Sequence, residues 1–179
     1  MQTLISSRLS AVRSNEVVLS FVGFLLLFAC SQITIPLQPV PITLQTVAVM
    51  IIGLTFPARA GLAAIALYFA AAAFGFPVLN NWTGGLERFT GPTAGYLLGF
   101  FVAILSMFSF RRMWSSTSFV ATLTNCALGT LIIFVFGVAW LSSLLGFNIA
   151  LQVGLLPFIL PGIVKALLLC SGLHYLRTK

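Results

Sequence analysis

Residues 35–46 read Ile-Pro-Leu-Gln-Pro-Val-Pro-Ile-Thr-Leu-Gln-Thr. The three prolines of this block lack a backbone N–H, so the block cannot belong to a regular helix. It also contains no charged residue that would hold it in water, and the segments on both sides are apolar enough to lie in a membrane. Non-helical backbone is tolerated near a membrane only where it is buried in protein or lines a wet cavity. The block therefore predicts the wall or lid of a site.

The chain as a whole has the composition of an integral membrane protein. Of its 179 residues, 60% are hydrophobic and only 6% are charged, and the mean hydropathy is +1.13. A soluble domain carries about 25% charged residues. Apolar runs of about 20 residues, the length that spans a bilayer, would use most of the chain. We therefore expect a single transmembrane domain over residues 1–179 and no soluble catalytic domain.

The apolar segments predict an all-α bundle of six transmembrane helices. A polar segment, residues 1–16, precedes them, and a loop rich in Gly and Asn, residues 75–92, divides them. Pro157 and Pro161 interrupt the last segment, so its continuous helix is expected to begin near Pro161. The expected spans are residues 17–34, 42–56, 60–74, 93–110, 119–145 and 152–176.

The basic residues predict how this bundle is oriented. With six spans, one side of the membrane holds Arg8, Arg13, Arg59, Arg111, Arg112, Arg177 and Lys179. The other side holds only Arg88, beside Glu87. Cytoplasmic loops carry the excess of Lys and Arg, so both termini and residues 1–16 are expected in the cytoplasm. The protein is then a multi-pass protein of the plasma membrane, with its proline block and 75–92 loop on the outer face.

The net charge of +7 does not indicate nucleic-acid binding. The basic residues lie at the ends of apolar runs, whereas a nucleic-acid site gathers them into a patch with aromatic residues. We therefore expect no nucleic-acid partner.

Lys165 is the ionisable residue placed deepest in an apolar run. Ionisable residues within a membrane are costly and indicate function by default. If the last helix begins near Pro161, Lys165 lies in its first turn, where the ammonium and the helix dipole together suit an anion or a polar carbonyl. The alternative is a lysine that only extends to the outer interface.

The 75–92 loop offers further groups that could bind a ligand. Arg88 could hold a carboxylate through two parallel hydrogen bonds, or it could simply pair with Glu87. Asn80 and Asn81 each present a donor and an acceptor, which suits a cyclic amide or urea. Trp82 could pack over a small ring or anchor at the membrane interface.

Two more polar residues enter neighbouring spans on the same predicted face. Gln45 stands at the start of the second span, and Tyr96 stands at the start of the fourth. Each is weak evidence by itself, and their convergence on the outer face is the reason to include them in a site.

An enzymatic function is not expected, nor a cofactor. The chain has no Asp, its two Glu are Glu16 and Glu87, and its one His is His174 near the C-terminus. These residues cannot form a nucleophile–base pair or a metal cluster. A proton-driven carrier would place acidic or histidine relays within its spans. The sequence therefore predicts a solute-binding protein without an energy source of its own.

Two long segments, residues 35–46 and 91–100, resemble the signature motifs of the BioY family. BioY proteins are the biotin-specific S components of energy-coupling factor (ECF) transporters. The resemblance runs from about Ser31 to Leu169. It also includes Gly75–Val78, Gly84–Gly85, Pro157 and Lys165.

The resemblance implies a six-helix S-component bundle that binds biotin from the extracytoplasmic side and lies in membrane lipid. It also implies an ECF T component and ATPase subunits as partners that power uptake. The expected biotin-binding residues are Gln45, Asn80, Asn81, Trp82, Arg88, Tyr96 and Lys165. The alternatives are an S component for a related vitamin or precursor, and a solitary biotin carrier without a dedicated ATPase.

One position departs from the pattern of the family. Members use a carboxylate and a lysine in the last helix to hold the ureido head, and here the acidic position is Gly162, three residues before Lys165. Asn80 or Asn81 is then the expected acceptor for the ureido N–H groups. We assign the ureido carbonyl to Lys165 and the valerate carboxylate to Arg88, with the reverse assignment left open.

Overall fold

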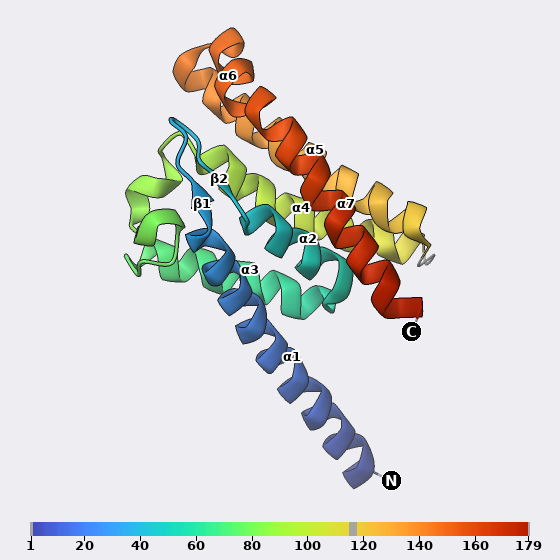
Figure 1. The fold of residues 1–179 in the computed structure, drawn as a ribbon. Helices are drawn as coiled ribbons and strands as arrows, with labels where there is room; N and C mark the ends of the chain where they lie inside the picture. Colours follow the sequence, from blue (N-terminus) through green and yellow to red (C-terminus); the bar gives the residue numbers. More distant parts are fainter. Residues whose placement is uncertain (1, 115–117, 179) are drawn as a thin grey trace.

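The computed structural model describes the backbone of residues 2–114 and 118–178 and the side chains of residues 15–114 and 118–176 (Figure 1). The side chains of Arg8, Arg13, Arg177 and Lys179, on which the predicted orientation partly depends, lie outside the described residues. The helices are α1 (Gln2–Gln32), α2 (Gln45–Thr55), α3 (Ala58–Ala73), α4 (Ala94–Met113), α5 (Phe119–Leu145), α6 (Phe147–Gly154) and α7 (Leu156–Thr178). The short 3-10 helices η1 (Asn80–Trp82) and η2 (Leu86–Phe89) lie within the 75–92 loop.

The predicted all-α membrane bundle is confirmed. Four helical stretches are long and apolar enough to cross a membrane, namely residues 15–32, 94–113, 119–145 and 147–176. The other two predicted spans correspond to α2 and α3, which are apolar but shorter, with 11 and 16 residues. Because most residues of α2 are buried by neighbouring helices, it does not need the length of a lipid-facing span.

The start of the last helix differs from the prediction. α7 begins at Leu156, which places Pro157 in its first turn, where a missing N–H breaks no helical bond. Pro161 lies inside the helix and leaves the carbonyl of Pro157 without its usual partner. Lys165 is therefore about two and a half turns from the start. The predicted contribution of the helix dipole at Lys165 is wrong, because that effect fades beyond the first turn.

The proline block forms a β-hairpin as far as Thr43, and its last two residues, Gln45 and Thr46, begin α2. β1 (Thr34–Ile35) pairs antiparallel with β2 (Ile42–Thr43), with Thr34 opposite Thr43. All three prolines lie in residues 36–41, the turn between the strands, where a missing N–H removes no ladder bond. We call residues 34–43 the lid hairpin.

The lid hairpin and the 75–92 loop lie at one end of the bundle, together with the junction of α6 and α7 (Figure 1). Both termini lie at the opposite end. This arrangement agrees with the predicted grouping of the three irregular segments on one face. Which membrane side that face occupies stays a prediction.

Small residues allow the central helices to approach closely. A Cβ on Gly95 would lie 2.3 Å from the Cβ of Trp140, and one on Gly99 would lie 2.9 Å from the Cα of Ile133. These contacts join α4 to α5 along the wall of the pocket described below. Helix association in a membrane depends on such close packing, because lipid supplies no hydrophobic driving force.

Candidate functional site

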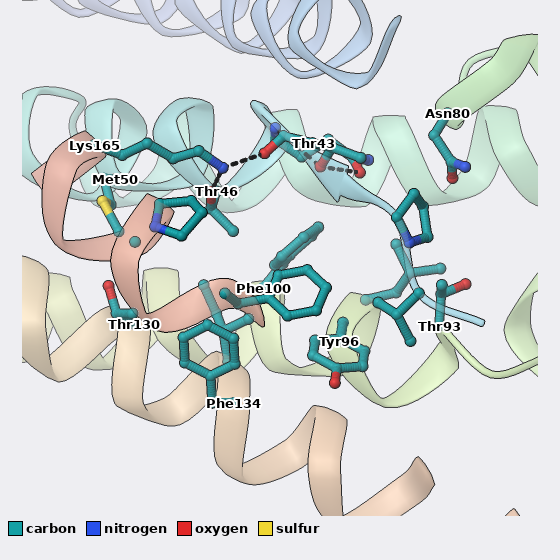
Figure 2. A pocket seen from close by; sticks show the side chains of 18 of the residues that line it. Thr43, Thr46, Met50, Asn80, Thr93, Tyr96, Phe100, Thr130, Phe134 and Lys165 are labelled. Atoms are coloured by element: carbon teal, nitrogen blue, oxygen red, sulfur yellow. Dashed lines mark hydrogen bonds between the residues drawn. The ribbon is translucent and has the colours of Figure 1, made fainter. Parts of the chain in front are cut away.

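A pocket lies beneath the lid hairpin, between α2, α4, α5 and α7 (Figure 2). Its empty volume is about 770 Å³, part of which is open to the solvent. The side chains with polar groups that line it are Thr43, Gln45, Thr46, Asn80, Thr93, Tyr96, Thr130 and Lys165. The apolar lining comprises Val40, Pro41, Met50, Leu79, Leu97, Phe100, Ile133, Phe134, Phe158, Pro161 and Gly162. Such a mainly apolar cavity with a few polar groups is typical of a small-molecule site.

Lys165 brings a positive charge to the inner wall of this pocket. Its Nζ donates to the carbonyl oxygen of Thr43 at 2.6 Å and lies 3.5 Å from Oγ1 of Thr46. The side chain is half-buried, and the described lining residues include no carboxylate. An ammonium has three N–H donors, so both charge and hydrogen-bonding capacity remain for a ligand.

Lys165 and Asn80 stand at opposite ends of the pocket, with Thr43 between them (Figure 2). Asn80 belongs to η1, and Lys165 belongs to α7, so the 75–92 loop and the last helix form the two ends. The pocket therefore suits an elongated molecule with a polar group at each end and an apolar body.

Gln45 lies on the pocket wall with its amide already bonded at both atoms. Nε2 donates to the hydroxyl oxygen of Tyr68 at 2.6 Å, and Oε1 accepts from Oγ1 of Thr43 at 3.0 Å. These bonds hold the side chain in one orientation, because rotation would break both.

Tyr96 presents its ring to the pocket and uses its hydroxyl within the fold. The hydroxyl donates to the carbonyl oxygen of Gly154 at 2.8 Å, in the short helix α6. The ring stacks on Phe158, with the ring centroids 6.4 Å apart. A Cβ on Gly137 would lie 2.3 Å from the Tyr96 ring, so the glycine makes room for it. The Tyr96–Phe158 pair forms an aromatic wall between α4 and α7.

Four of the seven residues predicted for the site line this pocket, and three do not. The four are Gln45, Asn80, Tyr96 and Lys165. Trp82 is 65% exposed and packs edge-on against Phe28. Asn81, beside it, is exposed at a φ of 56°, and Arg88 is exposed on η2.

Three hydroxyl groups of the lining, those of Thr46, Thr93 and Thr130, were not among the predicted site residues. Thr93 stands within the 91–100 motif, one helical turn before Tyr96, so its position was available as a signal. Thr130 offered none. It bonds the carbonyl oxygen of Cys126, as Thr124 bonds that of Val120, yet Thr130 faces the pocket and Thr124 is exposed.

Comparisons with known proteins agree on one family. A model of the BioY family matches residues 2–178. The probable biotin transporter BioY of Pyrococcus horikoshii is 35% identical over 159 residues, which are 87% of this chain and 91% of the relative. The probable biotin transporter BioY of Rickettsia prowazekii is 31% identical over 162 residues, or 90% and 83% of the two chains.

A solved structure shares the fold. The crystal structure of the S component for biotin from an ECF-type ABC transporter superposes with a TM-score of 0.77 and 24% sequence identity. The match covers 97% of this chain and 94% of the solved one.

Proposed function

The chain belongs to the BioY family, and from this membership we propose that it binds biotin and serves as the substrate-binding S component of an ECF transporter. It is a membrane protein of a transporter family and not an enzyme. One observation carries the proposal beyond membership: a covered, mainly apolar pocket with Lys165 at one end and Asn80 at the other.

The chemistry of biotin fits this pocket. Its ureido head and its valerate carboxylate are polar, and its fused rings and methylene chain between them are apolar. Phe100, Phe134 and the Tyr96–Phe158 pair offer apolar surface to the rings and chain. Burial of this surface supplies affinity, and the polar groups at the two ends orient the ligand.

We assign the ureido head to the Lys165 end. The ammonium would donate to the ureido carbonyl oxygen, and the hydroxyl oxygen of Thr46, 3.5 Å from Nζ, would accept from a ureido N–H. Thr46 would thus take over part of the role of the carboxylate that Gly162 lacks. Asn80 is a weaker candidate for that role than expected, because it stands at the far end of the pocket.

We assign the valerate carboxylate to the Asn80 end. The Asn80 amide would donate to it, and Arg88 on the same loop would attract it electrostatically from outside the lining. Asn81 and Trp82, next to Asn80 on η1, would support this end of the pocket without direct contact. The reverse orientation, with the carboxylate on Lys165, is tested below.

Uptake requires an energy source, and we propose that ECF T and ATPase subunits supply it. The described spans contain no chain of acidic or histidine residues that could relay protons: Glu16 stands alone at the start of the span 15–32, His174 stands alone near the end of the span 147–176, and Glu87 lies in the 75–92 loop. We further propose that the whole chain is one transmembrane domain in the plasma membrane, with residues 1–16 and both termini in the cytoplasm and the pocket open to the outside.

The test is titration of the purified chain with biotin by isothermal calorimetry. Saturable binding of biotin is expected, with no binding of an unrelated vitamin in a parallel titration, and the absence of biotin binding would refute the proposal. Stronger binding of a biotin precursor would support the related-vitamin alternative. Uptake in cells that lack every T and ATPase subunit would instead indicate a solitary carrier.

A further inference from the structure

A second hollow lies on the surface of the bundle, between α5 and α6. Its empty volume is about 860 Å³, part of which is open to the surroundings. We call it the side groove. Its lining comprises Leu131, Phe134, Val135, Val138, Ala139 and Ser142 of α5, Phe147 and Leu151 of α6, and Leu155 between α6 and α7.

The chemistry of the side groove suits an apolar occupant. Its described lining contains no charged residue, and its one polar side chain, Ser142, donates to the Val138 carbonyl oxygen at 2.6 Å. Leu131, Val135 and Phe147 are each more than half exposed. Because α5 is long and apolar enough to cross a membrane, this exposed apolar surface faces lipid.

The length of the side groove matches the depth of one membrane leaflet. Residues 131 to 142 of α5 rise about 17 Å along the helix axis. One leaflet, half of the hydrocarbon core of a bilayer, is about 15 Å deep. The groove belongs to the half of α5 that leads to α6, at the end of the bundle that carries the lid hairpin (Figure 1). A lipid whose headgroup lies at that membrane surface can therefore lay one acyl chain along the whole groove.

Phe134 connects the side groove to the pocket beneath the lid hairpin, because it lines both. Its ring packs edge-on against Phe158, with the ring centroids 6.0 Å apart, and Phe158 stacks on Tyr96. Phe134 is only partly buried, so an empty groove would leave one side of its ring without dispersion contacts. What fills the groove therefore affects the aromatic wall of the pocket.

We propose that the side groove binds one acyl chain of a membrane lipid, which packs against Phe134 and stabilises the aromatic wall of the pocket. The binding of the acyl chain is independent of the proposed function. The effect on ligand affinity rests on that function, because it takes biotin as the ligand.

Native mass spectrometry of the chain in detergent, titrated with palmitoyl-oleoyl phosphatidylethanolamine, tests the occupant. One lipid should bind more tightly than any further lipid. Ala139→Trp places an indole in the groove at an exposed position, so binding of that lipid should weaken about tenfold, the loss expected when about ten carbon–carbon contacts are displaced. The matched control is Ala127→Trp, at an exposed alanine of α5 outside the lining, and it should leave lipid binding unchanged.

A second lipid separates the acyl chain from the headgroup. Dihexanoyl phosphatidylethanolamine has the same headgroup, but its short chains would leave most of the groove empty, so it should bind much more weakly. Equal binding of the two lipids would overturn the proposal, and so would an equal loss in Ala127→Trp. A dimer that Ala139→Trp dissociates would also overturn it, because the groove would then be an interface between copies. Val135→Phe fills the groove partly and provides the same test if Ala139→Trp does not fold.

Biotin titration measures the effect on the pocket. If the wild-type chain binds biotin, removal of the lipid should raise the dissociation constant about threefold, because the Phe134 ring loses a few contacts. Ala139→Trp should abolish this dependence on lipid, since the indole supports Phe134 in place of the chain, and Ala127→Trp should retain it. A wild-type affinity that is independent of lipid would refute the support of the wall. If the wild-type chain does not bind biotin, the proposed function fails, and mass spectrometry still decides whether the groove binds an acyl chain.

Discussion

The Lys165→Met variant is the sharpest test of the proposed site. Methionine keeps an unbranched chain of similar length and removes the charge and the donors. The hydrogen bond of 2.6 Å from Lys165 to the Thr43 carbonyl oxygen is charge-assisted. The described lining contains no carboxylate that could pair with the ammonium in place of the ligand. A hydrogen bond to a charged group contributes about 1.5–3 kcal/mol. The dissociation constant for biotin should therefore rise roughly 10- to 150-fold.

Calorimetric titration of two ligands would also decide the orientation. The primary amide of biotin keeps the ureido head and loses the carboxylate charge. If Lys165 holds the ureido head, the variant should lose affinity for biotin and for the amide by the same factor. If Lys165 holds the carboxylate, the wild type should bind the amide weakly, and the substitution should change that binding little.

The control is Arg112→Met, which removes an exposed cation at the end of α4 far from the pocket lining. It should leave both titrations unchanged. An unchanged biotin affinity in Lys165→Met protein that unfolds at the wild-type temperature would refute the reasoning and remove Lys165 from the site.

Three further predictions concern residues outside the pocket lining. Arg88→Gln should raise the dissociation constant for biotin less than about fivefold, since exposed charges contribute about 0–1 kcal/mol. This loss of affinity should shrink at high salt. A larger loss of affinity that does not depend on salt, in the same calorimetric titration, would show direct contact between Arg88 and biotin. Asn125→Leu should stabilise the fold by about 1 kcal/mol. The reason is that Asn125 Oδ1 is buried without a partner among the described residues, and Nδ2 makes only a 3.3 Å bond to the Met107 carbonyl oxygen. A lower thermal unfolding midpoint of the variant in detergent would contradict this prediction. Gly137→Ala should lower the stability of the fold by about 1–3 kcal/mol through overpacking, since the added Cβ would overlap the Tyr96 ring. It should also weaken biotin binding by displacing that ring. A variant with wild-type affinity for biotin would show that the aromatic wall tolerates displacement.

The regular elements followed from local properties of the sequence. Long apolar segments predicted spans because the cost of burying backbone groups in lipid leaves helix as the available structure. The prolines at positions 36, 39 and 41 excluded a helix there, and the structure has a hairpin over residues 34–43. The start of α7 was placed five residues too late, because a proline in the interior of a membrane helix is tolerated when neighbouring groups satisfy the freed carbonyl.

The individual side chains of the site were harder to predict. Arg88 and Asn80 belong to the same loop, yet Asn80 lines the pocket and Arg88 is exposed. The irregular backbone of the loop, which reaches positive φ at Asn81 and Trp82, decides which residues turn inward. No pattern of residue types at fixed spacing encodes that path.

By itself, the sequence determined that this protein is a helical membrane bundle with a non-helical cover over a site, and its motifs indicated the family. These features depend on the polarity and backbone freedom of each residue, which act locally. The tertiary structure decided that Lys165 bonds Thr43, 122 positions away, and that Gln45 is held by Tyr68. Such contacts depend on how the helices pack, and packing is set by the close approach of residues from the whole length of the chain.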